Sequence, residues 1–358
     1  MPNQEYEQRL FALLETVAEQ GASDLHLSAG RAPTLRVDGE LIALQKQPVL
    51  SPRDTEDFAH VLLNESQFAR LKARRSIDLS YAYKNKARFR VNVYYQLGTI
   101  SVAMRFIPAK IRTIEELNLP EALHSFAKYQ QGFVLITGPA GHGKSTTLAA
   151  IIDEINRKRA EHIITIEDPI EYLFSQDRAI IDQREVGYDT PDFASALRAS
   201  FRQDPDVIML GEMRDAETMS AAITAAETGH LIFTTLHTNN AAQSIDRIID
   251  TFASEQQNQV RAQLALTLVG VVSQRLIPKV EGGRVPATEI MFSNSAIRNL
   301  IREKKVYEIS LVIETSADEG MISLNRSLAT LVRGGDISMD VAESYSLNPS
   351  ELRILVNR

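Results

Sequence analysis

Apolar residues near the start of the chain first recur at helical spacing and then alternate with polar residues. The positions that share one face of the predicted first helix are Leu10, Leu13, Leu14 and Val17. Residues 34–37 and 40–44 flank Asp38-Gly39, a pattern typical of a β-hairpin. Period-two alternation over 87–94 and 99–106 predicts two half-buried strands. Together these patterns predict a small α/β domain over residues 1–107.

From about residue 121 the pattern changes to short apolar runs that alternate with helical segments. This alternation is typical of a parallel sheet with crossover helices. The predicted strands are Phe133–Thr137, Ile163–Ile166, Val207–Leu210 and Leu231–Leu236. A polar stretch bracketed by Pro108 and Pro120 separates the two patterns. We therefore place a linker at 108–120, a second α/β domain at 121–293 and a helical segment at 294–358.

Composition suits two folded domains and excludes several kinds of site. The chain has 358 residues, 44% of them hydrophobic, and no cysteine. Without cysteine there can be no disulfide, iron–sulfur cluster or cysteine-ligated zinc. The formal net charge of −7 argues against general nucleic-acid binding as the main role.

No segment reads as a signal peptide or a membrane span. Glu5 and Glu7 stand where a signal peptide would carry basic residues. The most apolar later stretch, 264–272, has about half of the ~20 residues that a membrane helix needs. We expect a cytoplasmic protein with no transmembrane segment, which contacts the membrane through a partner.

A phosphate-binding loop follows the predicted strand at 133–137. It fits G-x-x-x-x-G-K-[ST] with the residues Gly138, Pro139, Ala140, Gly141, His142, Gly143, Lys144 and Ser145. The glycines let backbone N–H groups point at phosphate oxygens, and the helix that begins near Thr146 adds a favourable dipole. Lys144 would reach the β- and γ-phosphates, and Ser145 would hold Mg²⁺. The loop predicts binding of a nucleoside triphosphate, with the His142 side chain pointing to solvent.

Two glutamates at predicted strand ends are the candidate catalytic carboxylates. Glu212 closely follows the strand at 207–210, where it would polarise water or hold the water shell of the metal. Glu167 directly follows the strand at 163–166 and is our candidate general base. At both positions the alternative is an ordinary acidic residue at a strand end or in a turn.

Histidine and arginine residues supply further candidates. His237 ends the strand at 231–236 and would sense the γ-phosphate, unless local backbone groups simply satisfy its ring. Arg88, Arg90 and Arg105 lie on the polar faces of the two strands predicted within 87–106. If those strands pair, the three arginines share one surface. Closure of the first domain would then bring a cation to the developing charge, whereas the alternative is a solvated face.

Several motifs together resemble the secretion-type ATPase superfamily and, within it, the type IV pilus retraction ATPases (the PilT type). The matching segments are 21–27, 36–39, 87–92, 166–171 with its acidic box, 183–187, 204–215 with its Walker B region, and 228–239 with its histidine box. The resemblance covers nearly the whole chain. It implies a PAS-like N-terminal domain, a RecA-like core with C-terminal helices, and a homohexamer.

The resemblance also implies an activity. Family membership would make Glu212 and Glu167 catalytic and would make ATP and Mg²⁺ the cofactors, with Ser145 and, through water, Glu212 at the metal. Hydrolysis would drive an inner-membrane platform protein so that pilin subunits leave the fibre. The family usually has Thr and Ser where this chain has Ala140 and His142, a difference that bears on the rate.

Two features favour the retraction branch of the superfamily: a C-terminal segment, and the lack of features typical of the other branches. Residues 296–303 resemble a C-terminal signature needed for retraction, and they also read as an amphipathic helix with Arg298 and Arg302 outward. The four-cysteine zinc site and long N-terminal extension of the assembly and secretion branches have no counterpart here. An accessory retraction paralogue (the PilU type) and a secretion-system assembly ATPase are the alternatives. A helicase fits least, since no aromatic–basic strand-binding patch is evident.

Overall fold

The computed structural model describes residues 4–37, 39–83, 87–108 and 110–357, and it divides the chain into two compact units. Unit 1 comprises Met1–Lys110 and Asp168–Leu173, and unit 2 comprises Ile111–Glu167 and Phe174–Arg358. The pattern of the sequence placed residues 168–173 in the second domain, whereas in the structure they belong with unit 1. The chain therefore leaves unit 2 once, directly after Glu167, and returns at Phe174.

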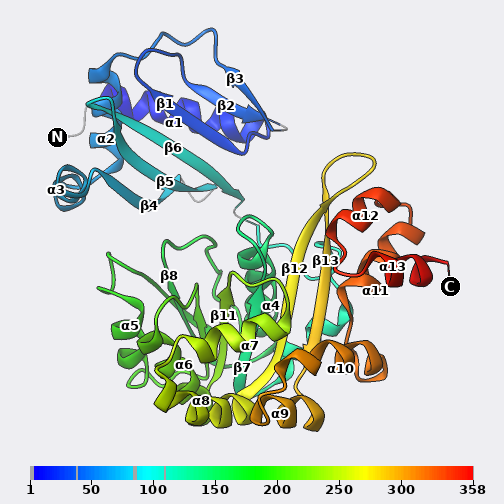
Figure 1. Ribbon diagram of the computed structural model, residues 1–358. Helices are drawn as coiled ribbons and strands as arrows, with labels where there is room; N and C mark the ends of the chain where they lie inside the picture. Colours follow the sequence, from blue (N-terminus) through cyan, green and yellow to red (C-terminus); the bar gives the residue numbers. More distant parts are fainter. Residues whose placement is uncertain (1–3, 38, 84–86, 109, 358) are drawn as a thin grey trace. The chain divides into compact units, whose positions relative to one another are not determined.

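Unit 1 is an antiparallel sheet with helices packed on its apolar face (Figure 1). Its elements are the helices α1 (Gln4–Glu19), α2 (Pro52–Leu62) and α3 (Glu65–Arg74) and the strands β1 (Asp24–Ser28), β2 (Thr34–Val37), β3 (Glu40–Ala43), β4 (Ser76–Tyr83), β5 (Ala87–Gln96) and β6 (Thr99–Pro108). The strand order is β3-β2-β1-β6-β5-β4. The predicted helix, hairpin and strand pair are thereby confirmed, while Asp38 of the hairpin turn lies outside the described residues.

The core of unit 1 follows from the alternation along its strands. Leu25 and Leu27 of β1 and Phe89 and Val91 of β5 are fully buried, and they share one cluster with the four apolar residues of α1. Because side chains of a strand alternate between faces, the intervening residues, among them Arg90, lie on the opposite face of the sheet. The polar face of unit 1 is thus set by the period-two pattern of its sequence.

Unit 2 is built on a second sheet that is parallel except at one edge. Its strands are β7 (Gly132–Thr137), β8 (His162–Glu167), β9 (Ile180–Glu185), β10 (Val207–Leu210), β11 (Leu231–Leu236), β12 (Leu268–Pro278) and β13 (Arg284–Phe292). The order is β13-β12-β7-β11-β10-β8-β9, with β13 antiparallel to β12. The four predicted strands are confirmed as β7, β8, β10 and β11. Strands β9, β12 and β13 were not predicted.

Helices cover both faces of this sheet. They are α4 (Lys144–Lys158), α5 (Phe193–Ser200), α6 (Ala216–Glu227), α7 (Ala241–Asp250), α8 (Ser254–Thr267), α9 (Ser295–Arg302), α10 (Ile309–Thr315), α11 (Leu324–Arg333), α12 (Met339–Tyr345), α13 (Pro349–Val356) and the 3₁₀ helices η1 (Glu121–Lys128), η2 (Val306–Glu308) and η3 (Ala317–Glu319). On β7, Phe133 and Leu135 pack with α5 to α8, while Val134 and Ile136 pack with α4 and η1. A strand buried on both faces reads as a continuous apolar run, which is why β7 was evident in the sequence.

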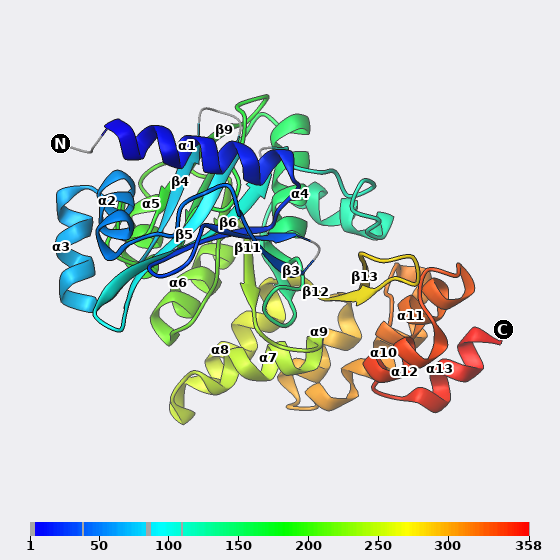
Figure 2. The ribbon, with the colours of Figure 1, turned by 90° about the horizontal axis from the view of Figure 1, so that it is seen from above.

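The C-terminal helices of the chain pack against strands β12 and β13. Helices α11, α12 and α13 pack against the end of β12 and the start of β13 (Figure 2). There Ile277, Val285 and Ala287 form one apolar cluster with residues of these helices. The apolar stretch 264–272 divides between the end of α8 and the start of β12. Among the described residues, no helix combines the length and apolar character that crossing a membrane would require.

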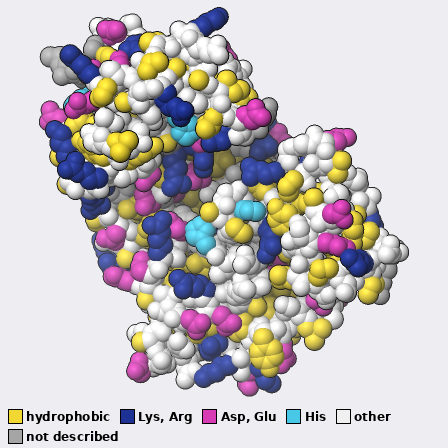
Figure 3. All heavy atoms as spheres, turned by 45° about the horizontal axis from the view of Figure 1, so that its top comes forward, with side chains coloured by type: hydrophobic (Ala, Val, Ile, Leu, Met, Phe, Trp, Pro, Cys, Tyr) yellow, Lys and Arg dark blue, Asp and Glu magenta, His cyan; other side chains and the backbone are white. Residues whose placement is uncertain are grey.

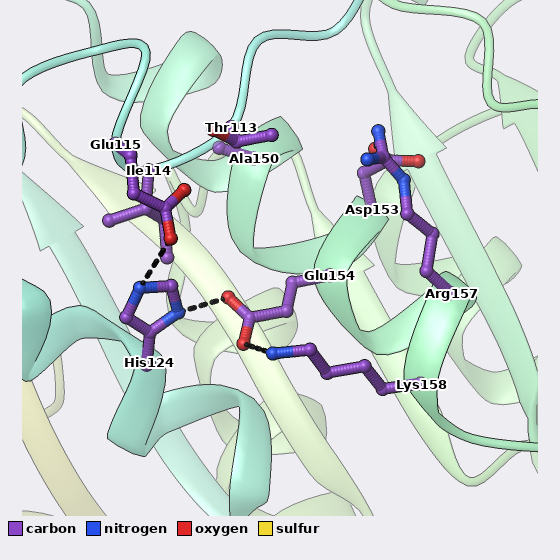
Figure 4. A pocket seen from close by; sticks show the side chains of 9 residues that line it. All are labelled: Thr113, Ile114, Glu115, His124, Ala150, Asp153, Glu154, Arg157 and Lys158. Atoms are coloured by element: carbon purple, nitrogen blue, oxygen red, sulfur yellow. Dashed lines mark hydrogen bonds and ion pairs between the residues drawn. The ribbon is translucent and has the colours of Figure 1, made fainter.

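A small polar pocket of about 160 Å³ lies beside α4, where His124 of η1 stands between two carboxylates (Figure 4). The ring atom Nδ1 lies 2.6 Å from Glu154 Oε2 of α4, and Nε2 lies 3.1 Å from Glu115 Oε1. Lys158 adds an ion pair of 2.7 Å to the other oxygen of Glu154. These contacts join the segment just after the boundary between the units to the helix that follows the phosphate loop.

Candidate functional site

The predicted site residues of unit 2 lie at the ends of four neighbouring parallel strands. In the order β7-β11-β10-β8, each strand pairs in parallel with the next. The segments at their carboxyl ends hold Lys144, His237, Glu212 and Glu167, respectively. Parallel strands end at one edge of a sheet, and in open α/β sheets that edge is where ligands bind. Residues as much as 93 positions apart are thereby brought into contact.

The phosphate loop has the backbone conformation that its glycines permit. Gly138, Gly141 and Gly143 have φ of 143°, 76° and 81°, and α4 begins at Lys144. Residues with a Cβ atom rarely adopt a backbone conformation with positive φ, so the three positions require glycine. The first turn of α4 presents its unpaired N–H groups and the positive end of its dipole to the loop, which makes the loop a suitable anion site.

Lys144 is nearly buried and lies within the loop. Its ammonium Nζ donates to the carbonyl oxygens of Gly138 and Pro139, both at 2.9 Å, and lies 3.3 Å from His237 Nδ1. Only 7% of Lys144 is exposed. The loop carbonyls therefore hold the ammonium inside the phosphate loop.

Glu212 and His237 extend this group along the sheet edge. His237 Nε2 lies 3.6 Å from Glu212 Oε2, and the other carboxylate oxygen of Glu212 forms an ion pair with Arg214. Thr235 of β11 donates to the carbonyl of Gly211 at 2.6 Å, which holds the end of β10 beside β11. Lys144, His237 and Glu212 thus form one connected set of polar side chains.

Glu167 is the last residue of β8, and side chains of β8 and β9 donate to its carboxylate. Its Oε1 accepts the Thr165 hydroxyl at 2.7 Å and the side-chain amide of Gln183 at 3.3 Å, and only 6% of the residue is exposed. Thr165 and Glu167 share one side of β8 because they are two residues apart. The sequence motifs gave no sign that Thr165 and Gln183 support Glu167, although Gln183 begins the motif at 183–187.

The three candidate arginines belong to unit 1. Arg90 and Arg105 are directly opposite each other where β5 pairs with β6, and Arg88 lies two residues before Arg90 on the same face. The expected pairing is confirmed, and the arginines share one sheet face as predicted. Arg105 forms an ion pair of 2.9 Å with Asp24 of β1.

Segment 168–173 meets this arginine face within unit 1. Arg88 Nη2 donates to the Ser80 hydroxyl at 2.6 Å, and Arg88 Nε donates to the carbonyl of Ile170 at 3.3 Å. Arg90 pairs with Glu171 at 3.3 Å. The arginines therefore hold the segment that directly follows Glu167 along the chain.

The expectation that the His142 side chain points to solvent is wrong. Its ring atom Nδ1 accepts a hydrogen bond from the backbone N–H of Leu276 in β12 at 2.9 Å. Partial burial, followed by the nearby cations Arg284, Lys144 and Arg275, lowers the pKa of His142. A lowered pKa favours the neutral ring, which can accept at Nδ1. The sequence carries no local signal for this contact because Leu276 lies 134 residues away.

The charge around the loop differs from that of the whole chain. Acidic and basic side chains are interspersed over the face drawn in Figure 3, and the formal net charge is −7. Around the loop, however, Arg284 Nη1 lies 3.4 Å from the carbonyl of Gly141, and Lys144 stands inside it. Local cations, rather than a basic surface overall, therefore favour a phosphate group at this position.

The residues present suit Mg²⁺ bound together with a nucleotide. Ser145 is exposed at the start of α4, and Glu212 offers carboxylate oxygens, the kind of donor that Mg²⁺ prefers. No group of three or more His, Asp and Glu side chains in the described residues is arranged to hold a metal ion by itself. Mg²⁺ at nucleotide sites keeps several waters and uses phosphate oxygens, so one or two protein ligands suffice.

A family model described as type II/IV secretion system protein matches residues 3–283. The type IV pilus retraction ATPase PilT of Pseudomonas aeruginosa is 45% identical over 337 residues, which cover 94% of this chain and 98% of that protein. The type IV pilus ATPase PilU of the same organism is 38% identical over 96% of this chain and 92% of its own length.

A crystal structure of the pilus retraction motor PilT with bound ADP superposes with a TM-score of 0.89 at 45% identity. The match covers 96% of this chain and 98% of that one. The predicted α/β class, with an N-terminal domain and an ATPase core, is thereby confirmed.

Proposed function

The chain belongs to the type II/IV secretion system protein family, and we propose that it is a motor ATPase that drives retraction of a type IV pilus. The observation that carries the proposal is the connected set Lys144, His237 and Glu212 beside a complete phosphate loop, on a chain similar to PilT over nearly its whole length. The phosphate loop and the side chains that we propose to act on bound phosphate therefore share one sheet edge.

The proposed reaction is hydrolysis of ATP to ADP and phosphate. The loop N–H groups and Lys144 bind the β- and γ-phosphates and stabilise the negative charge that develops as the terminal phosphoryl group leaves. Mg²⁺ bound with the nucleotide would neutralise part of the phosphate charge. In our proposal Ser145 supplies its protein ligand directly and Glu212 supplies one through water.

In the proposed mechanism Glu167 and Glu212 have different roles toward the attacking water. Glu167 is held at Oε1 by Thr165 and Gln183, so its carboxylate has a defined orientation for accepting a proton. Glu212 orients or polarises the water from the neighbouring strand end. His237, between Lys144 and Glu212, would sense whether the γ-phosphate is present, because both of its ring nitrogens face residues of the site.

The arginines of unit 1 complete the proposed cycle. We propose that Arg88, Arg90 and Arg105 approach the phosphates when unit 1 closes, adding positive charge in the transition state. Segment 168–173 follows the proposed base directly and is held by Arg88 and Arg90. Domain movement and hydrolysis would then be coupled through the chain between Glu167 and Phe174.

We further propose a homohexamer in the cytoplasm, docked on the inner-membrane platform protein of the pilus machine. Retraction removes subunits from a fibre anchored in a membrane, and no described helix of this chain could cross one. A membrane-embedded partner must therefore receive the motion. An accessory retraction paralogue is the alternative, which the similarity to PilU supports.

One experiment tests the activity and the assembly together. ATPase turnover with Mg²⁺ and particle mass in solution are measured for the wild type and for Glu212→Ala. We expect a hexamer that hydrolyses ATP, and a mutant that binds ATP but has lost turnover. Full hydrolysis by Glu212→Ala would overturn its catalytic role. An inactive wild type would favour the accessory function, which would need a second ATPase.

Retraction itself is tested in cells. The gene is expressed in a piliated strain that lacks its own retraction ATPase, and pilus shortening and twitching are scored. Restored retraction supports the motor proposal. Restoration only alongside a second retraction ATPase identifies the accessory paralogue.

A further inference from the structure

The phosphate loop lies directly against strand β12, which no sequence motif connects with it. A Cβ atom added at Gly138 would lie 2.2 Å from the carbonyl oxygen of Gln274, and one at Gly143 would lie 2.8 Å from its side-chain nitrogen. Contacts below 3 Å are not tolerated without movement. The backbone of β12 therefore requires glycine at position 138. At Gly143 the short contact is with the end of the Gln274 side chain, and there the φ of 81° sets the requirement for glycine.

The Gln274 side chain uses both ends of its amide to hold this approach. Its Nε2 donates to the carbonyl oxygen of His142 at 2.8 Å, and its Oε1 accepts the hydroxyl of Thr147 at 2.6 Å. Gln274 is 3% exposed, so water does not compete freely for these bonds. Only a side chain with a donor and an acceptor at this length can join the loop to the first turns of α4.

The hydrogen bond from Gln274 to the His142 carbonyl also orients the backbone N–H of Gly143. His142 C=O and Gly143 N–H belong to one trans peptide group, in which they point to opposite sides. With the carbonyl turned toward Gln274, the Gly143 N–H must point away from β12 and into the loop. That N–H is among the groups that a phosphate-binding loop offers to phosphate oxygens.

We propose that Gln274 is a positioning residue that holds the phosphate loop in its phosphate-binding conformation from strand β12. This inference rests on the proposed nucleotide-binding function and adds to it a residue that acts through the loop. The ring of His142 provides a second tie to the same strand. β7 pairs with β12 only as far as Ser273, and the ring then accepts the N–H of Leu276 beyond that point.

The test compares two variants that lose the same hydrogen bond. Gln274→Leu removes the bonds to Thr147 and to the His142 carbonyl, whereas Thr147→Val removes only the first. We expect Gln274→Leu to bind ADP about tenfold more weakly, because the loop is no longer preorganised, and Thr147→Val to stay within about twofold of the wild type. Titration calorimetry with ADP and Mg²⁺ gives the affinities, and thermal unfolding shows whether both variants are folded.

Equal ADP affinities for the two variants would overturn the proposal and leave Gln274 a purely structural residue. If Gln274→Leu does not fold, Gln274→Met provides the same test, since its unbranched side chain has a similar length and also lacks both polar groups. A wild type that binds no ADP would instead contradict the proposed function. Wild-type binding with unchanged variants contradicts the role of Gln274 alone.

Discussion

Lys144 Nζ lies 3.3 Å from His237 Nδ1, although the two residues are 93 positions apart in the chain. The contact exists because β7 and β11 are adjacent parallel strands that end at the same level, Thr137 opposite Leu236. It places a cation of the phosphate loop next to a residue that also approaches Glu212. In our proposal nucleotide binding and hydrolysis depend on neighbouring side chains. Variants of single residues can therefore distinguish the contribution of each side chain to the two steps.

Lys144→Ala should abolish measurable nucleotide binding. The ammonium is the only side-chain charge of the phosphate loop, and its loss removes a charge-assisted bond to the β- and γ-phosphates. We expect ADP affinity to fall by about 100-fold or more, which corresponds to about 2.7 kcal/mol. Titration calorimetry measures it. ADP affinity within a few-fold of the wild type would show that the loop does not bind phosphate as described.

His237→Ala should impair hydrolysis more than binding. The ring faces both Lys144 and Glu212, so its removal leaves the loop intact while disturbing the groups around the γ-phosphate. We expect kcat to fall by about 10- to 100-fold with little change in ADP affinity. His230→Ala is the control, because His230 precedes β11 at its other end and bonds the carbonyl of Ala225. Equal losses in both variants would remove the sensor role.

Thr165→Val should slow hydrolysis by about tenfold, since it removes a hydroxyl that donates to the Glu167 carboxylate and helps to orient it. Glu167→Gln should lower kcat further, by about 100-fold or more, because an amide cannot accept the proton. Thr165→Ser keeps the hydroxyl and serves as the matched control. Steady-state rates with Mg²⁺ and ATP provide the measurement. A Glu167→Gln protein with normal kcat would refute the assignment of Glu167 as base.

Arg298→Ala combined with Leu300→Ala should leave ATPase activity largely intact and abolish retraction. Arg298 is exposed on α9, while Leu300 is partly buried against the core of unit 2. Leu300→Ala therefore also costs some stability, on the order of 1 kcal/mol. Leu300→Ala alone, compared by thermal unfolding, isolates that contribution. Loss of ATPase activity together with retraction would make α9 a structural helix.

Glu289→Gln should stabilise unit 2 above about pH 5. Burial raises the pKa of Glu289, whose Oε1 accepts the N–H of Ala241 at 2.8 Å. An acid with a raised pKa in the folded state supports folding at low pH, and this contribution is lost as pH rises from the unfolded value toward the folded one. A glutamine keeps the acceptor and cannot ionise.

We therefore expect the free energy of unfolding of Glu289→Gln to exceed that of the wild type by about 1 kcal/mol or more at pH 8. Near pH 4 the difference should shrink. Urea unfolding at several pH values measures it, with Glu281→Gln as a control because Glu281 is exposed between β12 and β13. A difference that is independent of pH would mean that Glu289 ionises as easily when folded as when unfolded.

Local patterns predicted most of the elements that carry the site. The strand–loop–helix around Lys144 and the strands before Glu167, Glu212 and His237 were evident because strand alternation, apolar runs and glycine requirements involve near neighbours. Strands β9, β12 and β13 were missed. Their polar residues, such as Gln183 and Gln274, interrupt the apolar pattern while making hydrogen bonds to partners far away in the sequence.

By itself, the sequence determined the phosphate loop, the parallel strands that lead to its candidate residues, and the polar arginine face of the first unit. Only the tertiary structure decided that β7 lies between β11 and β12, that residues 168–173 join unit 1, and that Gln274 and Leu276 hold the loop through His142. The physical reason is that sterics and side-chain periodicity act between neighbours in sequence. Strand order and buried polar contacts depend instead on which distant segments pack together most favourably.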